Sequence, residues 1–188
     1  RRRIATVVRD GFQQLWGRTG DTEEGEVSVR QLIAAGESNV LEFKQSARWS
    51  HKTDQHGKGE QIIAKTISGF LNGEGGTLLI GVSDHGGVVG VESDYKTIKK
   101  GNRDAYELLI AGIIKDKISG SALPLCRISF DDIDGKDICR VDVGGSAKPV
   151  YTKPHNGTDY SDFWVRQGNQ TAQVHGSDRE DYIAEHWG

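Results

Sequence analysis

Residues 36–46 read GESNVLEFKQS, and residues 62–84 read IIAKTISGFLNGEGGTLLIGVSD. Apolar and charged side chains alternate over residues 40–44, which is typical of a strand with one buried face. The second stretch begins with apolar residues at helical spacing and, after the glycines, becomes almost uniformly apolar over residues 77–82. That change of pattern predicts a helix, a tight turn and a strand covered on both faces. Two strands with a helix between them are therefore the expected centre of the fold.

Four charged residues of this region are expected to meet: Glu37, Glu42, Lys44 and Asp84. Glu42 and Lys44 share one face of their strand, because side chains two positions apart point to the same side. Glu37 can join Glu42 only if the chain bends between them, and the Ser-Asn pair there favours a turn. Asp84 follows the buried strand, where it can meet residues of a neighbouring strand. Each carboxylate alone is more typical of an ordinary setting: a solvated strand for Glu42, the end of a helix for Glu37 and a turn for Asp84. The prediction therefore depends on their convergence.

The stretch from Gln45 to Gly59 has turn composition and no apolar periodicity, so we expect a loop. Most charged residues between Lys44 and Lys65 are positive, and Trp49 offers a surface on which a nucleobase can stack. The residues expected to contact a nucleic-acid backbone are Arg48, Lys52, Lys58, Lys65 and Arg166. A solvated charged loop explains the same composition equally well.

Residues 27–188 are expected to form one domain. Ser28, with Gln31 three residues later, has the pattern of a capping box, and Gly36 is placed to end that short helix. A second amphipathic helix is expected over 104–118, and a last helix capped by Ser177. Further strands are expected at 88–91, 125–130, 137–143, 149–151 and 162–166. Helices interleaved with hairpins favour an α+β or mixed α/β fold around one sheet.

Composition limits the classes of protein that the chain can represent. No apolar run approaches the roughly 18 residues of a membrane span, and no signal-peptide pattern opens the chain. The two cysteines give no disulfide framework, so a reducing, cytoplasmic setting is expected. The net charge of -3 does not exclude nucleic acid, because a local basic stripe still binds phosphate. The motif GxxxxGK[ST] is absent, so no ATP binding is expected.

Residues 1–26 are expected to be a linker helix and an acidic tether from an upstream region. Apolar residues recur at helical spacing from Ile4 to Trp16, and the run GRTGDTEEGE follows. The chain contains no methionine, not even an initiator, so we interpret it as a piece of a longer protein.

The segments GESNVLEFKQS, KTISGFLNGEGGTLLIGVSDHGGVVGVESD, KPVY and FWVRQGN together resemble the Schlafen/AlbA-type nucleic-acid-binding domain. The resemblance runs from about residue 37 to about residue 175 and implies a central, mostly antiparallel sheet packed with helices. For Schlafen proteins it implies metal-dependent endoribonuclease action on structured RNA such as transfer RNA. By motif, the glutamates of ESxxxEFK match Glu37 and Glu42, the motif lysine matches Lys44, and the aspartate of IGVxD matches Asp84. The three acidic residues are thus expected to hold Mg²⁺ or Mn²⁺, which prefer oxygen ligands.

Two functions remain open at this point. One is an RNase domain of a bacterial defence protein, for example in antiphage defence, or of a stress protein; the acidic triplet favours this enzymatic interpretation. The other is a non-catalytic DNA- or RNA-binding or dimerisation module that serves an upstream effector domain. Animal Schlafen proteins resemble two such lobes joined in a clamp and also carry a zinc site, which two cysteines do not reproduce. A homodimer would therefore be needed to span a duplex stem.

Overall fold

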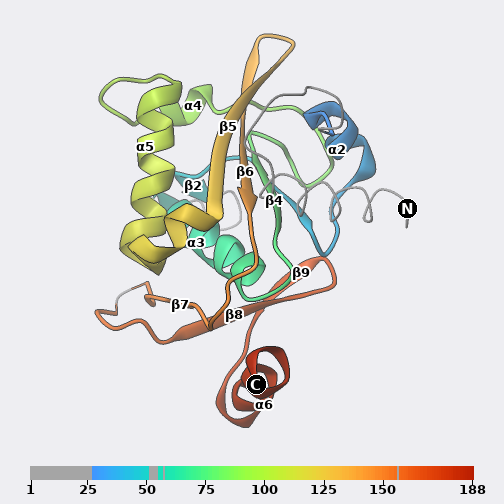
Figure 1. Cartoon of the computed structure of the whole chain (residues 1–188). Coiled ribbons are helices and arrows are strands. Elements are labelled where there is room, and N and C mark those ends of the chain that lie inside the picture. The colour runs from blue at the N-terminus through green and yellow to red at the C-terminus, as the bar shows by residue number, and fades with distance from the viewer. Residues whose placement is uncertain (1–26, 51–54, 57, 156) are drawn as a thin grey trace.

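A computed structural model describes residues 27–50, 55–56, 58–155 and 157–188 of the chain. The predicted linker helix and tether over residues 1–26 and the predicted phosphate contact Lys52 lie outside these residues. The described part has an α+β fold, as expected, with helices packed against a mixed sheet (Figure 1).

The central sheet has four strands in the order β1-β4-β6-β5. Their bounds are β1 (Leu41–Lys44), β4 (Gly76–Ile80), β5 (Cys126–Ile133) and β6 (Lys136–Val143). β1 runs parallel to β4, whereas the β4–β6 and β5–β6 pairs are antiparallel. Every residue of β4 is buried, as its uniformly apolar sequence predicts. β1 lies at the edge of the sheet, and within the described part of the chain β4 is the strand that pairs with it.

Helices cover both faces of this sheet. α3 (Lys58–Leu71) and α5 (Arg103–Ile113) contribute Ile67, Phe70 and Ile110 to a core that they share with β4 and β6. A π-helical turn from Ile114 to Ile118 prolongs α5. α2 (Val29–Ala35) covers the opposite face, where Leu32 packs with Phe43 and Leu79. Figure 1 shows α2 across the sheet from α3 and α5.

The ends of α2 confirm the expected capping signals. The Ser28 hydroxyl accepts a hydrogen bond from the Gln31 amide, and the Gln31 side chain reaches back to the Ser28 amide. Gly36 ends the helix at φ 76°, in the left-handed region that glycine adopts without steric cost. The helix therefore stops directly before Glu37, and the chain is free to turn there.

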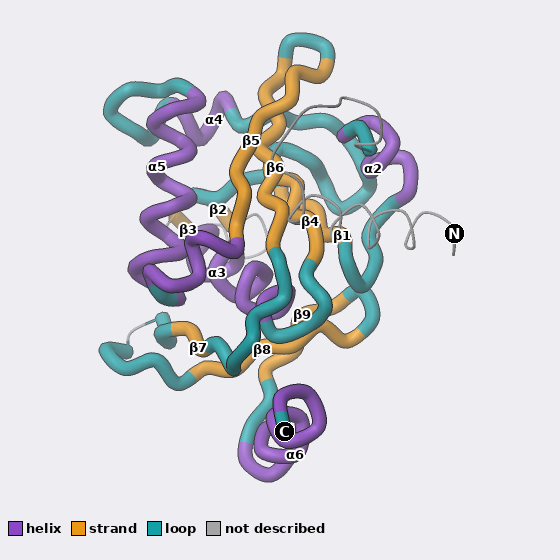
Figure 2. Tube along the Cα trace, in the orientation of Figure 1, coloured by secondary structure: helices purple, strands orange, loops and turns teal. Residues whose placement is uncertain are grey.

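The strands that follow residue 150 form a separate sheet instead of extending the central one (Figure 2). This sheet has the order β7 (Tyr151–Thr152), β8 (Asp162–Gln167) and β9 (Gln170–Gln173). β9 was not expected from the sequence, because QTAQ has little apolar character. It approaches α3 closely at Gly69, where an added Cβ would lie 2.7 Å from Cγ2 of Thr171.

Three local predictions are wrong. Residues 88–91 form no strand: Val88 makes an isolated bridge with Val82, and the chain then continues through Gly90 at φ 85°. The stretch from Gln45 to Gly59, expected to be a loop, contains two short strands, β2 (Trp49–Ser50) and β3 (Gln55–His56), which pair antiparallel. Ser177 lies inside α6 (Gly176–Trp187), and His175 occupies the N-cap. The elements α4 (Glu92–Tyr95) and a 3₁₀ helix (Gly120–Leu125) were not predicted.

Both cysteines of the chain lie on the central sheet. Cys126 and Cys139 are free thiols on β5 and β6. Burial raises the pKa of Cys126 to about 12 and that of Cys139 further, so both behave as small apolar side chains. None of the helices in the described part of the chain combines the length and the apolar character needed to cross a lipid bilayer.

Asn72 fastens the second sheet to the end of α3, so its removal should destabilise the domain. Its amide donates to the carbonyl oxygens of Val150 (2.8 Å) and Trp164 (2.9 Å) and accepts from the Val150 amide (2.8 Å). Because Asn72→Ala leaves these buried groups unpaired, we expect the free energy of unfolding in urea to fall by about 2–4 kcal/mol. Asn102→Ala, which removes only the exposed N-cap of α5, should cost about 1 kcal/mol. Equal losses would contradict this role of Asn72.

Candidate functional site

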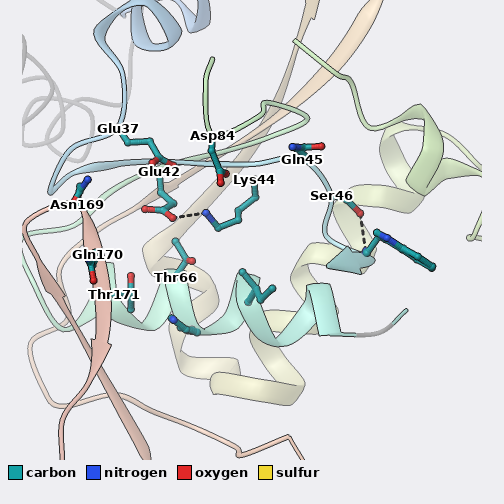
Figure 3. A pocket seen from close by; sticks show the side chains of 13 residues that line it. Glu37, Glu42, Lys44, Gln45, Ser46, Thr66, Asp84, Asn169, Gln170 and Thr171 are labelled. Atoms are coloured by element: carbon teal, nitrogen blue, oxygen red, sulfur yellow. Dashed lines mark hydrogen bonds and ion pairs between the residues drawn. The ribbon is translucent and has the colours of Figure 1, made fainter. Parts of the chain in front are cut away.

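A cavity of about 510 Å³ lies where β1, α3 and the β8–β9 hairpin meet (Figure 3). Most of its wall comes from residues 37–49, from residues 62–66 of α3 and from residues 169–171 of the β8–β9 hairpin. The lining residues are Glu37, Glu42, Lys44, Gln45, Ser46, Trp49, Ile62, Lys65, Thr66, Asp84, Asn169, Gln170 and Thr171. The four residues that the sequence predicts to meet are thus all in one cavity.

Glu37 reaches the cavity because the chain bends after α2. The Ser38 amide donates to the Leu41 carbonyl (2.9 Å), which closes a tight turn between Glu37 and β1. The Phe43 amide then donates to Oε1 of Glu37 (3.0 Å), so this carboxylate caps the free edge of β1. Burial is the largest cause that raises the pKa of Glu37; the Phe43 amide lowers this pKa, while the charge of Glu42 raises it further.

Glu42 lies between two cations. Its Oε1 is in contact with Nζ of Lys44, and its Oε2 accepts a hydrogen bond from Nη1 of Arg166 (2.8 Å). Nζ of Lys44 also donates to the Phe43 carbonyl (2.6 Å), so the ammonium group folds back against its own strand. Figure 3 shows the Lys44 and Glu42 side chains meeting above α3.

Asp84 comes from the turn that follows β4. The Ser83 amide donates to the Gly87 carbonyl (2.9 Å), which holds this turn. The Asp84 side chain is exposed and points toward the Glu42–Lys44 pair (Figure 3). The charge of Asp84 is the smallest of the causes that raise the pKa of Glu37.

The carboxylates suit a hard divalent cation, although the side chains do not surround one. Among the residues that the structure describes, no group of three or more histidine, cysteine, aspartate and glutamate side chains is arranged to hold a metal ion. Glu42 is paired with Lys44 and Arg166. The donor chemistry nevertheless fits, because three carboxylates line one cavity and two of them raise the pKa of the third. A cation would relieve that repulsion.

The basic residues predicted to contact phosphate differ in whether they line the cavity and in how they are paired. Lys65 lines the cavity and lies 4.9 Å from the centre of the Trp164 ring. Arg48 is paired with Glu60, and Lys58 begins α3. Arg166 is almost enclosed, with only 5% of its side chain exposed. Of these four described residues, only Lys65 reaches the cavity wall.

Sequence reasoning missed the wall opposite the carboxylates. Ile62, Lys65 and Thr66 present one face of α3 to the cavity, as their spacing of three and four residues allows. The β8–β9 hairpin adds Asn169, Gln170 and Thr171. The glycine in RQGNQ suggests a hairpin turn, but only the close packing of β9 on α3 brings these residues to the site.

Asp94 fixes the segment that forms one end of the cavity, and it too was missed as a site residue. Its buried carboxylate accepts hydrogen bonds from the Ala47 amide (2.8 Å), the Ser46 hydroxyl (2.5 Å) and the Tyr106 hydroxyl (2.7 Å). The chain therefore leaves β1 along a defined path, and Ser46 and Trp49 keep their places in the wall.

A protein-family match covers most of the chain. The family model described as Schlafen, AlbA_2 matches residues 37–175. The chain belongs to the Schlafen AlbA_2 family. This membership links the domain to a nucleic-acid-related function, and the match begins at Glu37 of the acidic site. No curated protein matches the chain.

A solved structure supports the fold of this Schlafen AlbA_2 domain. The crystal structure of the DIP2311 protein from Corynebacterium diphtheriae is similar over 98% of this chain, with a TM-score of 0.53 and 13% sequence identity. The chain spans about a third (34%) of the length of that protein. At this identity the similarity concerns the fold alone.

The raised pKa of Glu37 predicts how stability depends on pH. Above its ordinary value of 4.5, the unfolded chain loses this proton while the folded chain retains it. The free energy of unfolding should therefore fall as the pH rises from 4.5 through the higher folded pKa. Glu37→Gln, which keeps an acceptor for the Phe43 amide, should lack this fall and gain stability relative to wild type across that window. Urea unfolding at pH 4 to 8 measures it; a constant difference between the two proteins would contradict the prediction.

Proposed function

We propose that this Schlafen AlbA_2 domain is a metal-dependent endoribonuclease that cleaves structured RNA, such as transfer RNA, in a bacterial defence or stress protein. The observation that supports the proposal is the convergence of Glu37, Glu42, Asp84 and Lys44 on one cavity. Phosphodiester cleavage requires that negative charge be neutralised and that a nucleophile be placed in line with the leaving group. A cavity lined by three carboxylates and by the lysines Lys44 and Lys65 contains the residue types that this chemistry needs.

Each side chain has a defined part in this proposal. Glu37, Glu42 and Asp84 would hold Mg²⁺ or Mn²⁺, which supplies charge neutralisation and an activated water when bound. Lys44 would contact a non-bridging phosphate oxygen and stabilise the charge that develops there. For that contact Nζ of Lys44 must leave Glu42, and rotation about its four side-chain bonds permits this movement.

The remaining wall of the cavity is suited to an RNA substrate. The Asn169 and Gln170 side chains are exposed at the β8–β9 turn, and amide groups can bond to base edges or to a ribose hydroxyl. Lys65 adds a positive charge on α3 that can contact the backbone. One domain offers one such cavity, so we propose that two copies act together on a duplex stem.

A non-catalytic nucleic-acid-binding function is the second candidate. The observation that favours it is the pairing of Glu42 with both Lys44 and Arg166, which leaves the acidic side chains without a metal-holding arrangement among the described residues. In that case the carboxylates would stabilise the fold of the β1 edge, and binding would not depend on a divalent cation.

Cleavage assays with matched variants separate the two candidates. Purified domain should cut transfer RNA in the presence of Mn²⁺, and EDTA should abolish the cuts. Glu42→Gln and Asp84→Asn should each lower the cleavage rate by at least about 100-fold, because each removes one charged ligand while preserving shape. Glu107→Gln on the exposed side of α5 is the control and should retain the wild-type rate.

RNA binding is measured in the same series by filter retention. Both acidic variants should bind RNA at least as tightly as wild type, since each removes a negative charge that repels phosphate. Cuts that persist in Glu42→Gln and Asp84→Asn would remove these residues from the mechanism. Binding without any metal-dependent cleavage by wild type would favour the second candidate.

A further inference from the structure

Arg166 of β8 donates hydrogen bonds to several parts of the candidate site, although a phosphate contact would need a guanidinium group that is free to reach RNA. Its Nη1 donates to Oε2 of Glu42 (2.8 Å) and to Oγ1 of Thr171 (3.0 Å). Its Nη2 donates to the Ser38 carbonyl (2.5 Å), and its Nε donates to the Asn39 carbonyl (3.3 Å). The guanidinium group lies 4.9 Å from the centre of the Phe70 ring on α3.

Three of these acceptors lie in the bend that the acidic site requires and in the strand that follows it. Glu37 and Glu42 are five residues apart, and a continuous strand would direct them to opposite faces. The Ser38 and Asn39 carbonyls belong to the turn between them, and the Glu42 carboxylate belongs to the strand that follows. One guanidinium group thus fixes the turn and the carboxylate relative to each other. Since 95% of the side chain is enclosed, little of it is left for solvent or for RNA.

We infer that Arg166 is a positioning residue, which holds Glu37 and Glu42 at one cavity and couples them to the β8–β9 hairpin. This inference rests on the proposed function for its kinetic consequences, but not for its structural ones. The planar guanidinium fork serves acceptors in several directions at once. A lysine ammonium can keep the ion pair with Glu42 but cannot also reach the turn carbonyls and Thr171. Outer hydrogen bonds of this kind typically change metal affinity or activity by about 10- to 100-fold.

The test compares Arg166→Lys with Arg140→Lys. Arg140 is the matched control because it is also an enclosed arginine paired with a carboxylate, at 2.9 Å from Asp142, and it does not line the cavity. Both variants retain the charge, so a difference between them reports the geometry of the fork. Thermal melting in parallel confirms that each variant is folded at the assay temperature.

Steady-state cleavage of transfer RNA with Mn²⁺ gives the first measurement. Arg166→Lys should lower kcat by about 10- to 100-fold, with KM within about twofold of wild type, because Arg166 acts through Glu42 and does not touch RNA. The slope of log binding constant against log salt concentration should also be unchanged. Arg140→Lys should keep wild-type kcat. A raised KM with a salt slope smaller by about one would make Arg166 a phosphate contact and would overturn the inference.

Amide hydrogen exchange gives a second measurement, made without metal or RNA. The Phe43 amide at the edge of β1 is protected by Glu37, which keeps its place only while the turn is held. Its exchange should be at least about tenfold faster in Arg166→Lys and unchanged in Arg140→Lys. Equal exchange and equal kcat in the two variants would overturn the inference. If wild type does not cleave RNA, the proposed function fails and exchange at Phe43 alone decides the role of Arg166.

A third variant covers the case in which Arg166→Lys does not fold. Thr171→Val removes one acceptor of the guanidinium group and leaves the ion pair with Glu42 intact. It should speed exchange of the Phe43 amide by about threefold, and no change would overturn the inference in that case as well.

Discussion

The site depends on one constraint: the chain must bend sharply between Glu37 and Glu42, and the bend must be held. Two sets of hydrogen bonds hold it. The Phe43 amide, on the unpaired edge of β1, donates to Glu37, while Arg166 donates to the turn carbonyls and to Glu42. An edge strand normally leaves such backbone groups to solvent or to another chain. Here a carboxylate caps the edge, so the protection of the strand and the placement of an acidic residue have the same cause.

The second sheet has a direct part in this arrangement. β8 carries Arg166, β9 carries Thr171, and Asn72 ties the sheet to the end of α3. α3 therefore serves two functions, because its inner face packs in the main core and Ile62, Lys65 and Thr66 line the cavity. Residues more than 120 positions apart meet at Glu42 as a result. The acidic site is thus a property of two sheets and one helix, not of β1 alone.

Much of the fold was accessible from local patterns. The capping box at Ser28, the apolar stripe of α3 and the uniformly apolar β4 each gave a correct element, because local hydrogen bonding and burial decide them. One failure follows from tertiary context: QTAQ packs as β9 against α3 at Gly69, which no pattern within QTAQ indicates. The other is local, because Gly90, at φ 85°, lies within residues 88–91, which make one isolated bridge and no strand.

For the site, the sequence alone determined which residue types were available: carboxylates at Glu37, Glu42 and Asp84 and a lysine two residues after Glu42. Motif spacing also identified the family. Only the tertiary structure decided that these groups share one cavity, that Asn169 and Gln170 face them, and that Arg166 lies behind Glu42 and not on the surface. The physical reason is the distance in sequence over which each interaction acts. Spacing along a strand or helix fixes the face on which a side chain lies. The direction of a carboxylate depends on hydrogen-bond partners that the fold brings from distant parts of the chain.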